Sequence, residues 1–135
     1  GISLNTALVA NMIDEMPAFF IAAALAEGIT KVKDAKELRA KESDRLQAMS
    51  EVLQAFGVKS HLNGDGIVIN GLGKDGLFKS SEINSYGDHR IAMASSIASL
   101  RAEGETTIID CHNVNTSFPN FIDVSREVGI NIVEI

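Results

Sequence analysis

The spacing of apolar residues along the chain predicts four helices. The longest uncharged run, residues 16–26, follows two acidic residues, has a proline near its start and ends before Gly28. Helix formers dominate this run, so we predict a buried helix there. A later stretch repeats apolar residues at helical spacing and stops at Gly57, which is typical of an amphipathic helix. The predicted helices cover about 14–27, 43–56, 88–101 and 118–127.

Shorter segments that alternate apolar and polar residues predict strands between these helices. Two of them flank Asn63-Gly64-Asp65-Gly66, whose glycines favour a hairpin turn. Residues 71–79 hold three glycines and are predicted as a loop, and the residues before 14 are expected to be irregular. The predicted strands cover about 29–33, 58–62, 67–69, 106–109 and 130–133.

A sequence repeat joins these elements into two similar units. Residues 26–34, Ala-Glu-Gly-x-Thr-x-Val-x-Asp, return as Ala-Glu-Gly-x-Thr-x-Ile-x-Asp at residues 102–110, so every matched position is displaced by 76 residues. Each copy reads helix, strand, loop, helix, strand, and the first adds the hairpin strand. We therefore predict an α/β (α+β) fold of two units, about 14–71 and 81–135, whose sheets carry helices on one face. Chance similarity of two helix-to-strand junctions is the alternative.

The composition argues against several classes of function. A net charge of −6 without a run of Lys or Arg offers no surface for nucleic acid. Cys111 is the only cysteine and the three histidines are scattered, so neither a disulfide nor a metal site is expected. The uncharged run at residues 16–26 is too short to cross a membrane, which takes about 20 residues.

The setting and extent of the chain can also be predicted. A single cysteine fits a reducing compartment, and no basic segment precedes an apolar core at the N-terminus, so we expect a cytoplasmic protein without a signal peptide. The sequence opens in the middle of an irregular segment. We therefore expect it to be part of something longer.

Charged residues that could serve a function collect at the starts of three predicted helices. The offset of 76 places Asp14 opposite Arg90, and Lys-Glu-Ser-Asp-Arg opens the second helix at residues 41–45. Because the repeat puts Asp14 and Arg90 at equivalent helix starts, we expect Asp14, Arg45 and Arg90 to converge on one edge of the folded chain. Free backbone N–H groups and arginine forks at helix starts match phosphate or carboxylate oxygens, so we expect a small, multiply anionic ligand. The alternative is a set of solvated surface ion pairs. Asp88 and His89 can equally be capping or packing residues.

Four segments then resemble, in order and spacing, successive motifs of the EPSP synthases. They are Met-Ile-Asp-Glu-Met-Pro at 12–17, Glu-Leu-Arg-Ala-Lys-Glu-Ser-Asp-Arg-Leu at 37–46, Gly-Asp-His-Arg-Ile-Ala-Met at 87–93 and Thr-Ser-Phe-Pro at 116–119. The resemblance covers nearly the whole chain and identifies it as the C-terminal portion of such an enzyme. It implies repeated βαβαββ units with helices on mixed sheets, part of an inside-out α/β barrel domain. The N-terminal domain of the family has no counterpart here.

The same resemblance implies a transferase of the shikimate pathway of aromatic amino-acid biosynthesis. Such an enzyme moves the enolpyruvyl group of phosphoenolpyruvate to the 5-hydroxyl of shikimate 3-phosphate and releases phosphate, with no cofactor and no metal. By motif match, Asp14 takes the hydroxyl proton, Glu42 helps protonate the methylene carbon, Arg45 and Arg90 hold phosphoenolpyruvate, and Lys41 and His89 contact substrate. The sequence departs from many members at Thr116, where they carry a lysine.

Two other functions stay open at this point. One is an enolpyruvyl transferase acting on UDP-N-acetylglucosamine, and the other is a non-catalytic anion-binding domain of the same fold. Because the family closes its active site between two domains, we expect the isolated chain to be inactive under any of these interpretations.

Overall fold

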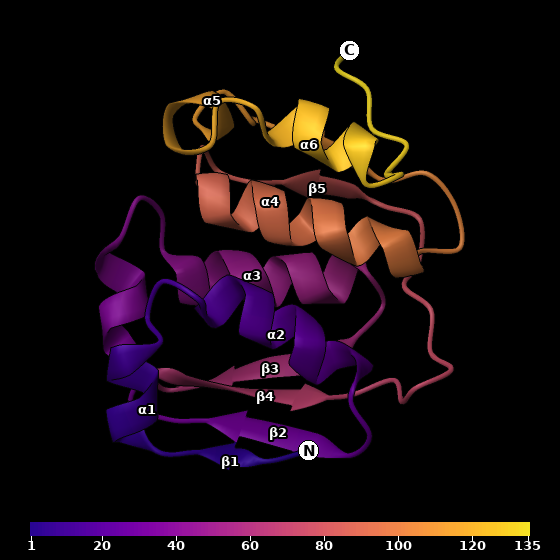
Figure 1. Cartoon of the computed structure of the whole chain (residues 1–135). Coiled ribbons are helices and arrows are strands. Elements are labelled where there is room, and N and C mark those ends of the chain that lie inside the picture. Colours follow the sequence, from indigo (N-terminus) through magenta and orange to yellow (C-terminus); the bar gives the residue numbers. More distant parts are fainter.

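The structure is a computed structural model that describes all 135 residues, and it stacks helices on one face of a four-stranded sheet (Figure 1). The strand order is β1-β2-β4-β3, with β1 parallel to β2 and the other pairs antiparallel. The sheet is therefore mixed. Its strands are β1 (Ser3–Leu4), β2 (Ile29–Val32), β3 (Lys59–Asn63) and β4 (Gly66–Asn70).

The predicted hairpin is present between β3 and β4. Asn63 pairs with Gly66, and Gly64 in the turn has a φ of 60°, a left-handed conformation that glycine adopts without strain. In β4, Ile67 and Ile69 point to the same face and are fully buried under the helices. The hairpin thus supplies the apolar sheet surface against which the helices pack.

The next layer contains three helices that pack against one another: α2 (Met16–Leu25), α3 (Arg45–Ala55) and α4 (His89–Ala98). Asp44 caps α3 by accepting from the Gln47 N–H, and Asp88 caps α4 by accepting from the Arg90 N–H. All three helices match predicted ones, with ends shifted by a few residues. The contacts described below show that they also begin at the same end of the layer.

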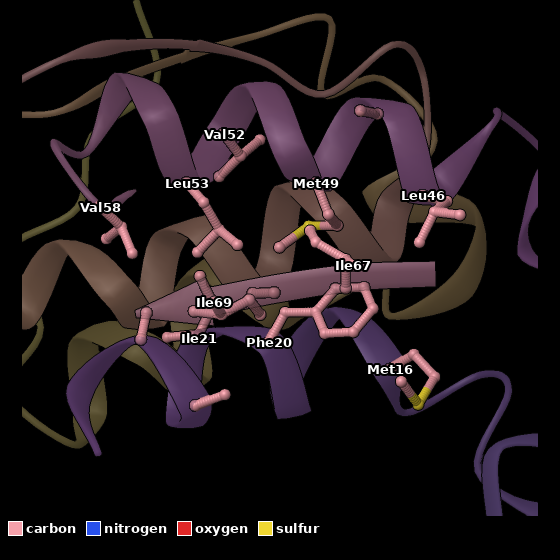
Figure 2. Close-up of a cluster of buried hydrophobic side chains, with 14 of the residues drawn as sticks. Met16, Phe20, Ile21, Leu46, Met49, Val52, Leu53, Val58, Ile67 and Ile69 are labelled. Atoms are coloured by element: carbon pink, nitrogen blue, oxygen red, sulfur yellow. The ribbon is translucent and has the colours of Figure 1, made fainter. Parts of the chain in front are cut away.

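The main core lies between the helices and the four-stranded sheet. Figure 2 shows Phe20 of α2 and Met49 and Leu53 of α3 facing Ile67 and Ile69 of β4, and all five side chains are almost completely buried. Burying a side chain of this size stabilises the fold by about 1.5–3 kcal/mol. This core fixes α2 and α3 relative to each other and so fixes the residues at their N-terminal ends.

A second, smaller layer covers α4 on the side away from the large sheet (Figure 1). Here β5 (Glu82–Asn84) runs parallel to β6 (Thr107–Ile109), and α5 (Val114–Ser117) and α6 (Phe121–Glu127) follow. Ala92 of α4 packs with Val114 and Phe121 in a separate apolar cluster. The remaining elements are α1 (Thr6–Asn11) and the 3₁₀ helices η1 (Lys36–Ala40) and η2 (Ser99–Arg101).

Two predictions about the C-terminal part are wrong. Residues 130–133 form no strand, because their backbone groups bond to α6 and to one another: the Ile130 N–H donates to Ser125, and Arg126 donates to the Ile132 carbonyl. The helix predicted over 118–127 starts only at Phe121. Pro119 disfavours a helical conformation in the residue before it, and Phe118 has φ −144° and ψ 79°.

Other elements differ from the predictions by omission or length. The N-terminal segment expected to be irregular contains β1 and α1, and neither η1, β5 nor α5 was predicted. The helix predicted over 88–101 ends at Ala98 and continues as η2. None of the helices has the length and apolar character needed to span a membrane.

The repeat is visible in backbone conformation. Asp34 and Asp110, which occupy matched positions after β2 and β6, have φ values of 54° and 62°, a left-handed conformation uncommon outside glycine. The sheets of the two copies differ, since the second copy has two strands and no hairpin. The division into units 14–71 and 81–135 stays a prediction.

Candidate active site

The N-terminal ends of α2, α3 and α4 meet at the side chain of Arg45. This arginine is the first residue of α3, and its side chain is 1% exposed. Its Nε donates to Asp88 Oδ2 at 2.7 Å, and its Nη2 lies 3.4 Å from Asp88 Oδ1. A carboxylate from the start of α4 thus holds one edge of the guanidinium in the interior.

The outward edge of the same guanidinium binds two further carboxylates. Nη1 donates to Asp14 Oδ1 at 3.0 Å, and Nη2 donates to Glu42 Oε2 at 2.6 Å. The side chains of Asp14 and Glu42 are 46% and 49% exposed, so both reach solvent. Arg45 therefore brings together the two residues to which the family resemblance assigns proton transfer.

Asp88 is the most enclosed acid of this group. It is fully buried, and besides Arg45 it accepts hydrogen bonds from the Ser43 hydroxyl at 3.0 Å and from the Arg90 N–H at 3.0 Å. Burial alone would raise the pKa of Asp88, but the hydrogen bond and charge of Arg45 outweigh it and lower that pKa. The buried carboxylate is consequently charged and paired.

Opposing effects also act on the pKa values of Arg45 and Asp14. Burial works against the charged guanidinium, yet the hydrogen bond and charge of Asp88 leave the pKa of Arg45 above its ordinary value. The hydrogen bond from Arg45 lowers the pKa of Asp14, with smaller contributions from the charges of Arg90 and Lys41. Asp14 is thus an ionised carboxylate, able to accept a proton.

Arg90 stands beside Asp14 at the start of α4. Its Nη1 donates to the Asp14 carbonyl at 3.1 Å, its Nη2 lies 3.7 Å from Asp14 Oδ2, and its side chain is 35% exposed. This confirms the expectation, drawn from the repeat, that Asp14, Arg45 and Arg90 converge at one edge. The functional roles assigned to them stay predictions.

Two hollows flank this cluster. One, of about 260 Å³, lies between α2 and α4 and is lined by Asp14, Arg90 and apolar residues such as Ile97. The other, of about 320 Å³, is more polar and is lined by Glu42, Asp44, Gln47, Glu51 and Tyr86, among others. Both cavities are open to solvent near a candidate proton-transfer carboxylate, which gives small ligands access to it.

The predicted cations differ in how accessible they are to an anion from solvent. Carboxylates cover the guanidinium of Arg45. An anion can therefore bind its outward edge only by displacing Asp14 or Glu42. Lys41 follows η1, is exposed and forms no ion pair or side-chain hydrogen bond, while Arg90 is partly exposed. Lys41 and Arg90 are therefore the cations that face solvent.

His89 and Thr116 contribute less to the cluster. His89 is the first residue of α4, is partly buried, and its ring forms no hydrogen bond within the chain. Thr116 is exposed in α5. No group of three or more His, Cys, Asp or Glu side chains is arranged to hold a metal ion.

Sequence reasoning missed Ser43 and the second role of Asp88. Both lie in the motifs already noted, but the sequence left Asp88 between a helix cap and a functional residue and did not pair it with Arg45. The available signal was its position at a helix start, two residues before Arg90. Its pairing with Arg45 depends on how α3 and α4 pack, which no local pattern reports.

Comparison with known proteins gives one consistent result. A family model described as EPSP synthase (3-phosphoshikimate 1-carboxyvinyltransferase) matches residues 1–124. The 3-phosphoshikimate 1-carboxyvinyltransferase of Hydrogenovibrio crunogenus is 50% identical over 137 residues, which cover 100% of this chain and 30% of that protein. Its counterpart from Coxiella burnetii (strain RSA 331) is 46% identical over 132 residues, 98% of this chain and 29% of that protein.

A solved structure agrees with the sequence comparisons. EPSP synthase from Acinetobacter baumannii has a TM-score of 0.92 and 45% sequence identity to this chain, covering 96% of it and 30% of the solved chain. The likeness confirms the predicted fold class, with helices packed on mixed sheets. The chain spans about 30% of the length of the curated relatives it matches.

Proposed function

Because the chain belongs to the EPSP synthase family, we propose that it supplies one wall of the active site of a longer enzyme that transfers an enolpyruvyl group. The donor is phosphoenolpyruvate and the acceptor is the 5-hydroxyl of shikimate 3-phosphate. The products are 5-enolpyruvylshikimate 3-phosphate and phosphate, and the enzyme serves aromatic amino-acid biosynthesis in the cytoplasm. The observation that carries the proposal is the junction of Asp14, Glu42 and Arg90 around Arg45.

Substrate binding falls to the exposed cations in this proposal. Phosphoenolpyruvate is a small, multiply charged anion, and arginine presents a fork that matches carboxylate and phosphate oxygens. Arg90 is partly exposed beside a cavity, and Lys41 carries an unpaired charge close enough to lower the pKa of Asp14. Arg45 joins them when an anion replaces one of its two outward carboxylates. His89, beside Arg90, is assigned to substrate contact.

Asp14 and Glu42 divide the proton transfers. Asp14, whose pKa Arg45 lowers, accepts the proton of the 5-hydroxyl as that oxygen bonds to the central carbon of phosphoenolpyruvate. Glu42 delivers a proton to the methylene carbon, which becomes a methyl group. In the second half of the reaction Glu42 takes back one methyl proton, and phosphate leaves with the proton that Asp14 had accepted. The double bond is thereby restored and the enol ether is formed.

The surrounding charges suit this reaction. Positive charge develops at the central carbon while both substrates are anionic, so fixed cations orient the substrates and carboxylates stabilise the transition state. The carboxylates of Asp14, Glu42 and Asp88 surround the guanidinium of Arg45, while Arg90 pairs with Asp14 and the charge of Lys41 also acts on Asp14. The positive charges balance the negative charges of the carboxylates. An anionic substrate can therefore approach the carboxylates that exchange protons with it.

The partner of this chain is the rest of the enzyme. The relatives are about three times as long, and in the family the active site closes between two domains. We therefore expect the 135 residues alone to be inactive and the complete enzyme, in which they are joined to the remaining part, to be active. The test is an assay of the complete enzyme with phosphoenolpyruvate and shikimate 3-phosphate, with UDP-N-acetylglucosamine as the competing acceptor.

A further inference from the structure

We propose that Asp88 is a positioning residue that orients Arg45 and, through it, the two proton-transferring carboxylates. This inference rests on the proposed function and adds a residue to it. Asp88 touches no substrate in this arrangement, because it is fully buried behind Arg45. Its effect on the reaction passes through the guanidinium.

The division of the guanidinium into two edges supports this role. Asp88 takes the inner edge through Nε and Nη2, while Asp14 and Glu42 take the outer edge through Nη1 and Nη2. When a ligand displaces an outer carboxylate, the inner edge keeps its partner. Asp88 then still neutralises the charge of the guanidinium and keeps its plane in the same orientation.

A comparison of the two helix caps shows that Asp88 does more than cap. Asp44 caps α3 through one hydrogen bond and pairs with Arg39, and its side chain is 39% exposed. Asp88 also caps its helix through one hydrogen bond, from the Arg90 N–H, yet it is fully buried and binds Arg45 and Ser43 as well. A buried charge needs such partners, because an unpaired one is costly. The same residue type at the same helix position therefore serves two different purposes.

Asp88 also links the two arginines of the site. One of its oxygens accepts from the backbone N–H of Arg90, and both interact with the side chain of Arg45. The hydroxyl of Ser43, which lies two residues before Arg45, donates a further hydrogen bond to Asp88. A shift of Asp88 would move Arg45 and the start of α4 together, and a misplacement of about 1 Å can cost a hundred-fold in rate.

The test compares Asp88→Asn with Asp44→Asn in the complete enzyme. Asparagine keeps the cap, being about as good a capping residue as aspartate, but it removes the charge that holds Arg45. Removing a negative charge would by itself favour capture of an anion. Positioning predicts the opposite: kcat/KM for phosphoenolpyruvate falls about a hundred-fold in Asp88→Asn and stays within about threefold in Asp44→Asn.

A double-mutant cycle tests whether Asp88 acts through Arg45. If it does, Asp88→Asn should reduce kcat/KM much less in an Arg45→Lys background than in the unmodified enzyme. Additive effects would contradict the inference, and so would a folded Asp88→Asn enzyme with kcat/KM within about threefold of normal. If Asp88→Asn fails to fold, Ser43→Ala takes its place, with an expected loss of about two- to tenfold; an unchanged value would overturn the inference.

The outcome also separates this inference from the proposed function. An unmodified enzyme without turnover on shikimate 3-phosphate would contradict both. An active unmodified enzyme whose Asp88→Asn variant is equally active would leave the proposed function in place and remove the role of Asp88.

Discussion

Arg90 donates from Nη1 to the backbone carbonyl of Asp14 at 3.1 Å, and these two residues occupy the same position in the two copies of the sequence repeat. The contact exists because α2 and α4 pack side by side with their N-termini at the same end. Each copy thus contributes a residue of opposite charge to one junction. The repeat that organises the fold therefore also builds the candidate site.

The first prediction concerns the exposed arginine of that junction. In the complete enzyme, Arg90→Ala should weaken phosphoenolpyruvate binding by roughly ten- to a hundred-fold, since a hydrogen bond to a charged group is typically worth about 1.5–3 kcal/mol. Steady-state KM measures the loss. Arg126→Ala, which removes an exposed arginine of α6, is the matched control and should leave KM unchanged. A normal KM in Arg90→Ala would make the residue a structural contact of Asp14.

The second prediction separates proton transfer from binding. Glu42→Gln keeps the size and polarity of the side chain but cannot relay a proton, so kcat should fall about a hundred-fold while KM for phosphoenolpyruvate changes little. Glu37→Gln, an exposed glutamate of η1 without an ion pair, controls for the lost charge. Equal kcat values for the two variants would return Glu42 to the role of a surface partner of Arg45.

Much of this arrangement could be predicted where the signal is local. The apolar run in α2 and the helical spacing of Leu46, Met49 and Leu53 predicted two packed helices, and Asn-Gly-Asp-Gly predicted the hairpin, because each pattern reports its own backbone conformation. The convergence of Asp14 with Arg90 followed from the repeat. Equivalent helices that pack in parallel must bring equivalent ends together.

Apart from the helix start that Pro119 delays, the main errors and omissions arose where the outcome depends on a distant partner. Residues 130–133 alternate like a strand but have no neighbouring strand to pair with, and their backbone bonds to α6 instead. The ion pair of Arg45 with Asp88 joins residues 43 positions apart and exists only through the packing of α3 on α4. The exposure of Glu42 and the burial of Arg45 depend on that same packing, so the sequence motif alone could not predict that the two side chains differ in burial.

The third prediction is a pH dependence of stability. Because the pKa of Asp88 is lowered in the folded chain, its contribution is present above the ordinary value of 3.8 and is lost as pH falls through the lower folded-state pKa. At pH 7, Asp88→Asn leaves the buried Arg45 without its inner partner and should lower the free energy of unfolding by about 3–5 kcal/mol.

Urea denaturation of the chain at several pH values checks this prediction. The difference between the unmodified chain and Asp88→Asn should shrink as the pH falls below the ordinary value of 3.8, because Asp88 then becomes neutral in both the folded and unfolded states. A difference that stays constant down to the most acidic pH at which the chain folds would show that the charge of Asp88 does not stabilise the fold.

The fourth prediction concerns the core beneath the site. Leu53 is completely buried between α3 and β4, so Leu53→Ala should destabilise the chain by about 2–5 kcal/mol through lost burial and a cavity. Its neighbour Gln54 is exposed on the same helix, and Gln54→Ala should change stability by no more than about 0.5 kcal/mol. Urea denaturation followed by circular dichroism measures both, and similar values for the two would contradict the packing described.

The central claim is that these residues serve an enolpyruvyl transfer to shikimate 3-phosphate. The most direct measurement incubates the complete enzyme with phosphoenolpyruvate and either shikimate 3-phosphate or UDP-N-acetylglucosamine, and follows phosphate release together with the enolpyruvyl product. The account predicts turnover with shikimate 3-phosphate, none with the nucleotide sugar, and none by the 135-residue chain alone. Absence of turnover with shikimate 3-phosphate, or turnover with UDP-N-acetylglucosamine in its place, would contradict it.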